Sequence, residues 1–175
     1  MQQSDLEQAF TDYRARVDEI ARTGRWGEFA DLFTQDATYR RAGHPDAVGR
    51  EAIRGWVLTS MTTFPGTMLD RHEVVWQSFD AAHDRVVFEL RNVLRDPGDG
   101  SVHAACSTTL LRHGHDGLWS YAEDSHNPLA YRTMWRSWGR AALRAGTLDT
   151  DETTTMTYLI GESAVGGDAA ASGVS

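Results

Sequence analysis

The sequence has little cysteine, an excess of acidic over basic residues, and no long apolar run. Its single cysteine, Cys106, excludes an internal disulfide and a cysteine-based zinc site. The formal net charge of -8 argues against nucleic acid or an anionic membrane as the main partner. No stretch approaches the length of a membrane span, and the first residues lack the basic and apolar regions of a signal peptide. We therefore expect a soluble, cytoplasmic protein.

Two kinds of cofactor motif are also missing. The 7 histidines include no H-E-x-x-H or similar spacing, and His113 and His115 lie in a glycine-rich turn where exposure is expected. No glycine-rich loop precedes a helix in the way that phosphate-binding loops do. We expect neither a metal nor a nucleotide, and thus no cofactor.

What the chain does contain is a long antiparallel meander. Four extended runs, each of roughly eight to eleven residues, are separated by short segments rich in Gly, Pro and Asp, as β-hairpins are. The runs occupy residues 72–79, 85–95, 102–112 and 118–126. Strands of about ten residues span roughly 30 Å, so a twisted sheet of them must curl. The function then depends on what lines the inside of the curl.

Helical patterns precede and follow the meander. Apolar residues at spacings of three and four predict a first helix that ends at Gly24, with Leu6, Phe10, Tyr13, Val17 and Ile20 on one face. A shorter amphipathic segment begins at Trp26 and stops near Gln35 and Asp36, and a short strand at 37–41 and a helix at 50–60 follow. Asn127 as N-cap and Pro128 at the first position begin a last helix, which Gly146 ends. Helices gathered on one side of an antiparallel sheet define an α+β domain.

The composition predicts one folded domain and a tail. A chain of 175 residues with 41% hydrophobic content buries one sizeable core. We place the domain at 1–146, and at 147–175 an acidic and then Gly-, Ala- and Ser-rich tail that is partly disordered or a lid. Within the tail, residues 153–160 could add a strand or cover a groove.

Three segments resemble a known family. The segments FADLFTQDATY at 29–39, GREAIR at 49–54 and YAEDSHNP at 121–128 are similar to the SnoaL-like branch of the nuclear transport factor 2-like superfamily. The resemblance covers roughly Leu6 to Ala142. It implies a cone-shaped, cystatin-like α+β barrel with a C-terminal helix, open to a ligand and usually dimeric through its sheet. Members include ketosteroid isomerases, scytalone dehydratases, limonene epoxide hydrolases, polyketide cyclases and binding modules, so the fold alone does not name the reaction.

The catalytic residues of two of these groups do not carry over. The base of the ketosteroid isomerases falls at or near Arg41, which cannot accept a proton, and their buried acid falls near Thr109. Tyr13 lies about one turn before the position of their tyrosine, where Val17 stands. The R-x-D pairing of the epoxide hydrolases occurs only at 16–18, on the first helix and not on a strand. Neither mechanism is supported.

The end of the last strand contains the pair of residues best suited to acid–base chemistry. Alternation places Leu118, Ser120, Ala122, Asp124 and His126 on one face, which we expect to point inward. A carboxylate beside an imidazole orients the ring and raises its basicity, which gives an acid or base that works near neutral pH. Alternatively, Asp124 binds backbone at the strand end and His126 is exposed before the helix cap.

Arg41 and Tyr39 share a face of the short strand. An inward Arg41 would bind a carboxylate or stabilise an enolate, and Tyr39 would donate to an oxyanion. The alternative is an ion pair from Arg41 to Asp124 or Glu51 that holds the open end of the barrel together.

These residues lead to two functional hypotheses. The first is a cofactor-independent isomerase, dehydratase or polyketide-cyclase-type enzyme that acts on an apolar small molecule, with Tyr39, Arg41, Asp124 and His126 as catalytic residues. Its substrate pocket comprises Tyr13, Val17, Trp56, Phe88, Asn92, Ser107 and Thr109. The second is a non-catalytic ligand-binding or dimerisation module, whose interior is small or filled by Trp56, Phe88 and Tyr121. We expect a homodimer through the sheet in either case.

Overall fold

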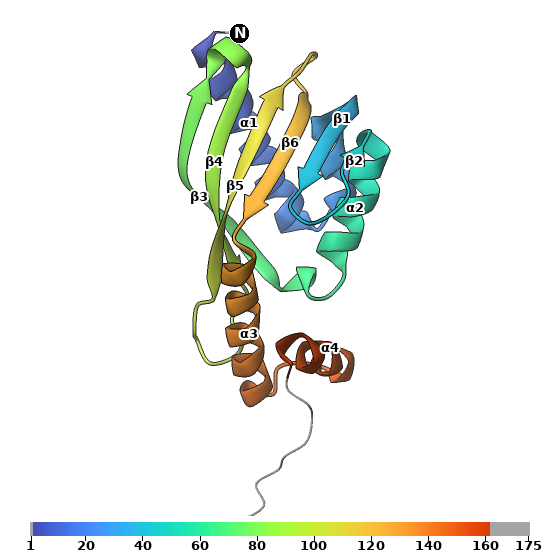
Figure 1. The fold of residues 1–175 in the computed structure, drawn as a ribbon, viewed down its shortest axis with the longest axis vertical. Helices are drawn as coiled ribbons and strands as arrows, with labels where there is room; N and C mark the ends of the chain where they lie inside the picture. Colours follow the sequence, from blue (N-terminus) through green and yellow to red (C-terminus); the bar gives the residue numbers. More distant parts are fainter. Residues whose placement is uncertain (1, 162–175) are drawn as a thin grey trace, which may run out of the picture.

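The computed structural model of the chain describes residues 2–161 (Figure 1). Its helices and strands follow the order α1 (Gln3–Thr23), η1 (Trp26–Leu32), β1 (Phe33–Arg41), β2 (Ala47–Val48), α2 (Arg50–Thr62), η2 (Gly66–Met68), β3 (Leu69–Asp80), η3 (Ala81–His83), β4 (Arg85–Leu94), β5 (Ala104–His113), β6 (Trp119–His126), α3 (Pro128–Ala145) and α4 (Thr150–Ile160). The tail was predicted to be partly disordered, and its residues 162–175 lie outside the described range.

The strands form one curved sheet of six strands in the order β2-β1-β6-β5-β4-β3. The meander β3-β4-β5-β6 is antiparallel throughout, as predicted, whereas β1 pairs with β6 in parallel. In Figure 1 the sheet curls around α1, and α2 lies beside β1 and β2. The expected α+β class and curved sheet are confirmed, with the barrel present as an unclosed sheet.

Local sequence explains where the long helices begin and end. The C-cap of α1, Gly24, has φ 70°, a left-handed conformation that costs glycine little. Asn127 caps α3 by accepting hydrogen bonds from the backbone of Leu129 and Ala130, and Pro128 follows at the first helical position. These boundaries agree with the sequence-based expectation.

Two boundaries differ from the expectation. The segment predicted as a second amphipathic helix is the 3-10 helix η1, and β1 begins at Phe33, four residues before the expected strand. Phe33 is fully buried, and its carbonyl accepts a hydrogen bond from Arg50 Nε at 2.8 Å. Burial of this side chain therefore extends the strand through Gln35 and Asp36, where the sequence suggested a stop.

Residues 153–160, considered as a possible strand, belong to helix α4. Threonine-rich segments favour strands, but Asp149 and Glu152 form a capping box at the start of this one. Met156 and Ile160 are buried against α3, where Gly139 leaves room for the Met156 side chain. The cap and this burial together outweigh the β propensity of the threonines.

The apolar interior divides into two clusters. The pocket cluster lies between α1, η1, α2 and the sheet, and its buried members include Leu6, Phe10, Ile20, Phe29, Phe33, Ile53, Phe88 and Trp119. The C-terminal cluster joins α3 and α4 to the end of the sheet that is lower in Figure 1. Its buried members are Met68, Leu94, Ala105, Met134, Trp138, Ala142, Met156 and Ile160. Among the described residues, no helix has both the length and the hydropathy to cross a membrane.

Candidate active site

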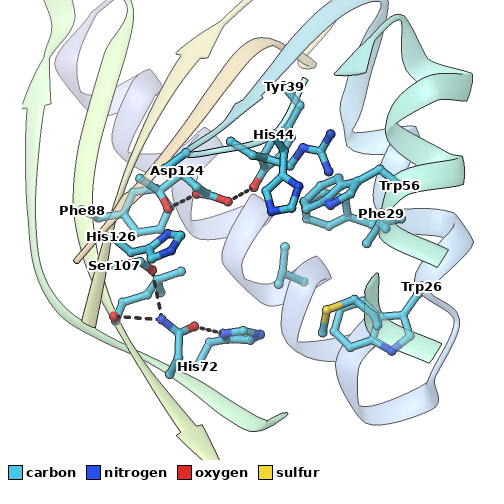
Figure 2. Close-up of a pocket in the computed structure, with 18 of the residues that line it drawn as sticks. Trp26, Phe29, Tyr39, His44, Trp56, His72, Phe88, Ser107, Asp124 and His126 are labelled. Carbon is cyan, nitrogen blue, oxygen red and sulfur yellow. Dashed lines mark hydrogen bonds between the residues drawn. The ribbon is translucent and has the colours of Figure 1, made fainter. Parts of the chain in front are cut away.

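A cavity of about 290 Å³ lies between the concave face of the sheet and the helices α1, η1 and α2 (Figure 2). All eleven residues named from the sequence as catalytic or substrate-binding line it: Tyr13, Val17, Tyr39, Arg41, Trp56, Phe88, Asn92, Ser107, Thr109, Asp124 and His126. Its wall also contains residues that the sequence did not suggest, chiefly Arg14, Trp26, Phe29, His44, His72 and Tyr131. The cavity is at the lower end of the range of volumes that hold small-molecule ligands, roughly 300–1,000 Å³.

Asp124 is held by two hydroxyl groups in the wall of this pocket. Its Oδ2 accepts a hydrogen bond from the Tyr39 hydroxyl at 2.6 Å, and its Oδ1 accepts one from Thr109 Oγ1 at 2.6 Å. Both donors are buried, with 4% and 2% of their surfaces exposed. Tyr39 comes from β1, the parallel neighbour of β6, and Thr109 is the antiparallel partner of Asp124 on β5. The fold of three strands thus fixes this carboxyl group.

The environment of Asp124 changes its acidity. Desolvation raises its pKa above the ordinary 3.8, and the hydrogen bonds from Thr109 and Tyr39 oppose this rise without cancelling it. Burial, reinforced by the neighbouring Asp124, raises the pKa of Tyr39 well above 10, so this hydroxyl stays protonated and remains a donor. Asp124 is therefore a carboxyl group that accepts a proton more readily than an exposed one.

The predicted pair of Asp124 and His126 lies on one face, but the two side chains are not hydrogen-bonded to each other. Both oxygens of Asp124 are engaged by Tyr39 and Thr109, which the strand register brings closer. The His126 ring instead packs on Tyr131 at the start of α3, with the ring centroids 4.5 Å apart. The expectation that the carboxylate orients the imidazole is therefore wrong, and His126 is positioned by an aromatic contact.

Arg41 is inward-facing and is not part of either ion pair that we considered. Its guanidinium lies 4.9 Å from the centroid of the Trp56 ring, and it donates a hydrogen bond to the Pro45 carbonyl at 2.6 Å. Glu51 pairs with Arg54 instead. The Nε atom of Arg41 is buried and has no hydrogen-bond partner among the described residues. Arg41 lines the cavity and brings a positive charge to its wall, while its Nε atom is itself enclosed by protein atoms.

A second polar network lies in the wall beside the first. His72 Nδ1 is 2.7 Å from Asn92 Oδ1, and Asn92 Nδ2 donates to Ser107 Oγ at 3.0 Å and to the Tyr131 hydroxyl at 2.6 Å. Figure 2 shows this network below Asp124, with the His72 ring extending into the pocket. Burial lowers the pKa of His72 below 6.5. The sequence contained a signal for His72, since it has the same parity as Val74 on its strand.

Apolar rings form most of the remaining wall. The ring centroids of Tyr39 and Trp56 lie 4.5 Å apart, and those of Phe29 and Trp56 lie 6.4 Å apart. Trp56 and Phe88 line the cavity without filling it. The interior is therefore a mostly apolar chamber with two polar groups of side chains on its wall.

Tyr121 and Cys106 lie outside the pocket. Tyr121 has the opposite parity to Asp124, and its hydroxyl donates to Glu123. Cys106 is exposed, because it has the opposite parity to the pocket residue Ser107 on β5. Within residues 2–161, no group of three or more His, Cys, Asp or Glu side chains is arranged to hold a metal ion.

A family model supports the similarity seen in the sequence. Residues 3–120 match the model of the SnoaL-like domain, which is more than half of the chain. No curated protein matches the chain.

Solved structures with the same fold come from proteins of low sequence identity. Aln2 from a Streptomyces species superposes with a TM-score of 0.58 at 20% identity, over 76% of this chain and 99% of that one. A protein from Catenulispora acidiphila in complex with S-DNPA has a TM-score of 0.54 at 23% identity, over 71% and 95%. The epoxide hydrolase/cyclase-like enzyme SalBIII, which has a role in pyran ring formation in the polyether salinomycin, has a TM-score of 0.55 at 15% identity, over 73% and 94%. At these identities the similarity establishes the fold alone.

Proposed function

The chain belongs to the family of SnoaL-like domains, and on that premise we propose that it is a cofactor-independent enzyme that moves a proton on a largely apolar small molecule. The reaction is of the isomerase, dehydratase or cyclase type. The observation that carries the proposal is Asp124, a desolvated carboxyl group with raised pKa that two hydroxyl groups hold in the wall of an apolar cavity. Such a group is suited to general acid–base catalysis because its pKa lies closer to the working pH than that of an exposed carboxylate.

Asp124 and the polar residues nearest to it have separate roles in this proposal. Asp124 donates or accepts the proton, while Tyr39 and Thr109 fix the direction of its oxygens. Arg41 lines the cavity, and its positive charge stabilises negative charge that develops on a ligand carbonyl or carboxylate oxygen. His126 lies two residues from Asp124 on the same face and contacts the ligand from the α3 side.

The apolar wall and the relatives support the choice of substrate class. Trp26, Phe29, Trp56 and Phe88 offer rings and no charges, so the bulk of a ligand must be apolar. The cavity of about 290 Å³ suits a bicyclic skeleton better than a steroid. SalBIII is described as epoxide hydrolase/cyclase-like, which is chemistry of the proposed type on the same fold.

The competing hypothesis is a binding or dimerisation module without turnover. That hypothesis expected side chains such as Trp56 and Phe88 to fill the interior. Instead, both residues line an open cavity beside Asp124. Binding without chemistry is a separate version of that hypothesis, and an assay of proton transfer distinguishes it. We also propose, for either function, that the protein forms a homodimer through the sheet.

Proton exchange provides a test that needs no knowledge of the natural substrate. We would incubate the protein with 2-tetralone, an apolar bicyclic ketone with acidic C–H groups, in D₂O and follow deuterium incorporation by ¹H NMR. Quenching of tryptophan fluorescence would first establish that the ketone binds, because Trp26 and Trp56 line the cavity. We expect exchange above the buffer rate, and a loss of about 100-fold or more in the Asp124→Asn variant.

The matched control is Glu123→Gln, the same chemical change one position away on the opposite face of β6. This variant should keep the exchange rate of the unmodified protein. Bound ketone without exchange above buffer would favour the binding module, and equal rates in Asp124→Asn and the unmodified protein would remove Asp124 from the mechanism.

A further inference from the structure

His72 is a titratable group in the pocket wall to which the proposed function assigns no role. It lies on β3 directly opposite Asn92 on β4, and its Nδ1 is 2.7 Å from Asn92 Oδ1. On its other side, the His72 backbone carbonyl accepts a hydrogen bond from Arg14 of α1 at 3.2 Å. Asn92 therefore positions the ring, and Arg14 holds the backbone of the same residue.

The surroundings of Asn92 fix which way its amide points. Its Nδ2 lies 3.4 Å from each of two backbone carbonyl oxygens, those of Leu90 and Ala105, in addition to its hydroxyl partners. A carbonyl oxygen accepts hydrogen bonds and cannot donate, so the amide nitrogen must face this side. Reversing the amide would bring its oxygen against two others. Oδ1 is therefore the atom that faces His72.

The orientation of Asn92 in turn fixes the tautomer of His72. Because Oδ1 has no proton, the hydrogen bond between the two residues requires a proton on His72 Nδ1. A neutral ring protonated at Nδ1 has its lone pair on Nε2. In Figure 2 the far edge of the ring points away from Asn92, into the pocket. The lone pair is thus presented to whatever occupies the cavity.

The charged groups around His72 do not change the neutral state of its ring. Arg14 of α1 opposes protonation of the ring, whereas Asp124 of β6 and Asp18 of α1 favour it. Arg14 also pairs with Asp18 at 3.1 Å, which offsets part of that carboxylate's influence. Desolvation is larger than each of these effects and keeps the pKa of His72 below its ordinary value, so the ring is neutral at neutral pH.

We propose that His72 is a second proton acceptor of the pocket, beside Asp124, and that the ligand is an apolar small molecule with a hydroxyl group or an acidic C–H that faces His72 Nε2. For binding, this needs only a hydrogen bond from the ligand hydroxyl to Nε2. For turnover, the inference rests on the proposed function. The ligand C–H bond breaks, its electron pair moves onto the ligand's carbonyl oxygen as an enolate, and the proton forms an N–H bond at Nε2. Arg41, which lines the same cavity, is the cation available to stabilise that oxygen.

The first experiment observes the tautomer without any ligand. Long-range ¹H–¹⁵N correlation spectra of the full chain distinguish a protonated from an unprotonated imidazole nitrogen, and the His72→Gln spectrum identifies the signals of His72. At pH 7 we expect a neutral ring with the proton on Nδ1. A proton on Nε2, or a fully protonated ring, would overturn the proposal.

The second experiment uses a hydroxyl-bearing probe and its plain counterpart. We would titrate the protein with 2-naphthol and with naphthalene, following tryptophan fluorescence. In His72→Leu the affinity for 2-naphthol should fall at least 10-fold, while that for naphthalene changes less than 2-fold. His72→Gln, which keeps a hydrogen-bond acceptor, should recover part of the 2-naphthol affinity. The surface variant His83→Leu is the matched control.

These results separate the inference from the proposed function. Loss of 2-naphthol affinity in His72→Leu supports the acceptor role even if the protein exchanges no proton of 2-tetralone, in which case only the enzymatic assignment fails. Equal 2-naphthol affinity in His72→Leu and the unmodified protein would overturn the inference even if Asp124→Asn abolishes exchange. Should His72→Leu not fold, as judged by circular dichroism, the His72→Gln titration and the tautomer measurement decide.

Discussion

The pocket cluster and the C-terminal cluster are built from the same kinds of residue but are packed differently. Around the pocket, aromatic side chains from α1, η1, α2 and the sheet stand apart and leave about 290 Å³ between them. In the C-terminal cluster, Gly139 of α3 has no side chain, and Met156 of α4 fills the space that a Cβ atom would need. One region keeps a cavity, whereas the other closes on itself.

The polar residues follow the same division. Asp124, Asn92 and Thr109 are buried or pocket-facing, and each is satisfied by neighbours on adjacent strands. The C-terminal cluster consists of apolar and aromatic side chains, and the indole of Trp138 donates its N–H to the Arg95 carbonyl at 2.7 Å. A buried polar group that faces a cavity costs stability that packing elsewhere must supply. The comparison indicates that α3 and α4 stabilise a domain whose other end retains a cavity.

The largest expected effect is the loss of Trp138. This side chain is fully buried, so Trp138→Ala removes its packing and leaves a cavity. We expect the free energy of unfolding, measured by urea denaturation, to fall by about 3–5 kcal/mol. Trp56→Ala, in the partly exposed wall of the pocket, should cost only about 1–2 kcal/mol because less apolar surface is lost. Equal losses would mean that the two clusters do not differ in packing.

Much of the pocket cluster could be predicted because it depends on local patterns. The helical spacing of Tyr13 and Val17 and the strand alternation of Asp124 and His126 each follow from a fixed period. These residues line the cavity as expected. The length of the strands predicted the curvature of the sheet, the family resemblance implied the same shape, and the curved sheet is confirmed.

The remaining features depend on register, which a single strand does not reveal. The partners of Asp124 are set by which residues of β5 and β1 lie opposite it, and this pairing is not encoded in β6 alone. A register shift between Arg112 and His113 turns Trp119 inward, against the alternation that placed Ser120 there. His72 shares the parity of Val74 on β3, but another register shift, between Val74 and Trp76, interrupts the alternation along the rest of that strand.

A smaller effect, from one ionisable group, should appear in the pH dependence of stability. The pKa of Asp124 is raised in the folded state by desolvation, so between its ordinary value of 3.8 and the raised value the native protein binds more protons than the unfolded chain. Stability must therefore decrease as the pH rises through this interval. Relative to Asp124→Asn, the unmodified protein should be most stable below pH 3.8 and lose that advantage as the pH rises. Urea denaturation at a series of pH values measures the difference.

Asp36 offers a control of opposite sign. The hydrogen bond from Thr34 lowers the pKa of Asp36, so its contribution is present above the ordinary value and is lost as the pH falls through the lowered one. Relative to Asp36→Asn, the unmodified protein should gain stability as the pH rises from acid. The same slope for both pairs would show that Asp124 is not desolvated in the folded protein.

The smallest effect tests whether α4 is part of the cooperative domain. Asp149 accepts a hydrogen bond from the Glu152 backbone N–H at 2.8 Å, and Glu152 Oε2 accepts one from the Asp149 N–H at 3.2 Å. Asp149→Ala removes the first of these, which should lower the free energy of unfolding by about 1 kcal/mol, while Asp149→Asn keeps a capping oxygen and most of the stability. This follows only if Met156 and Ile160 stay docked when the rest of the chain is folded, because a cap on an independently unfolding helix cannot change the global transition. A global unfolding midpoint in urea that is the same for Asp149→Ala and the unmodified protein would place α4 outside the cooperative unit, and the closed packing of the C-terminal cluster would then depend on α3 alone.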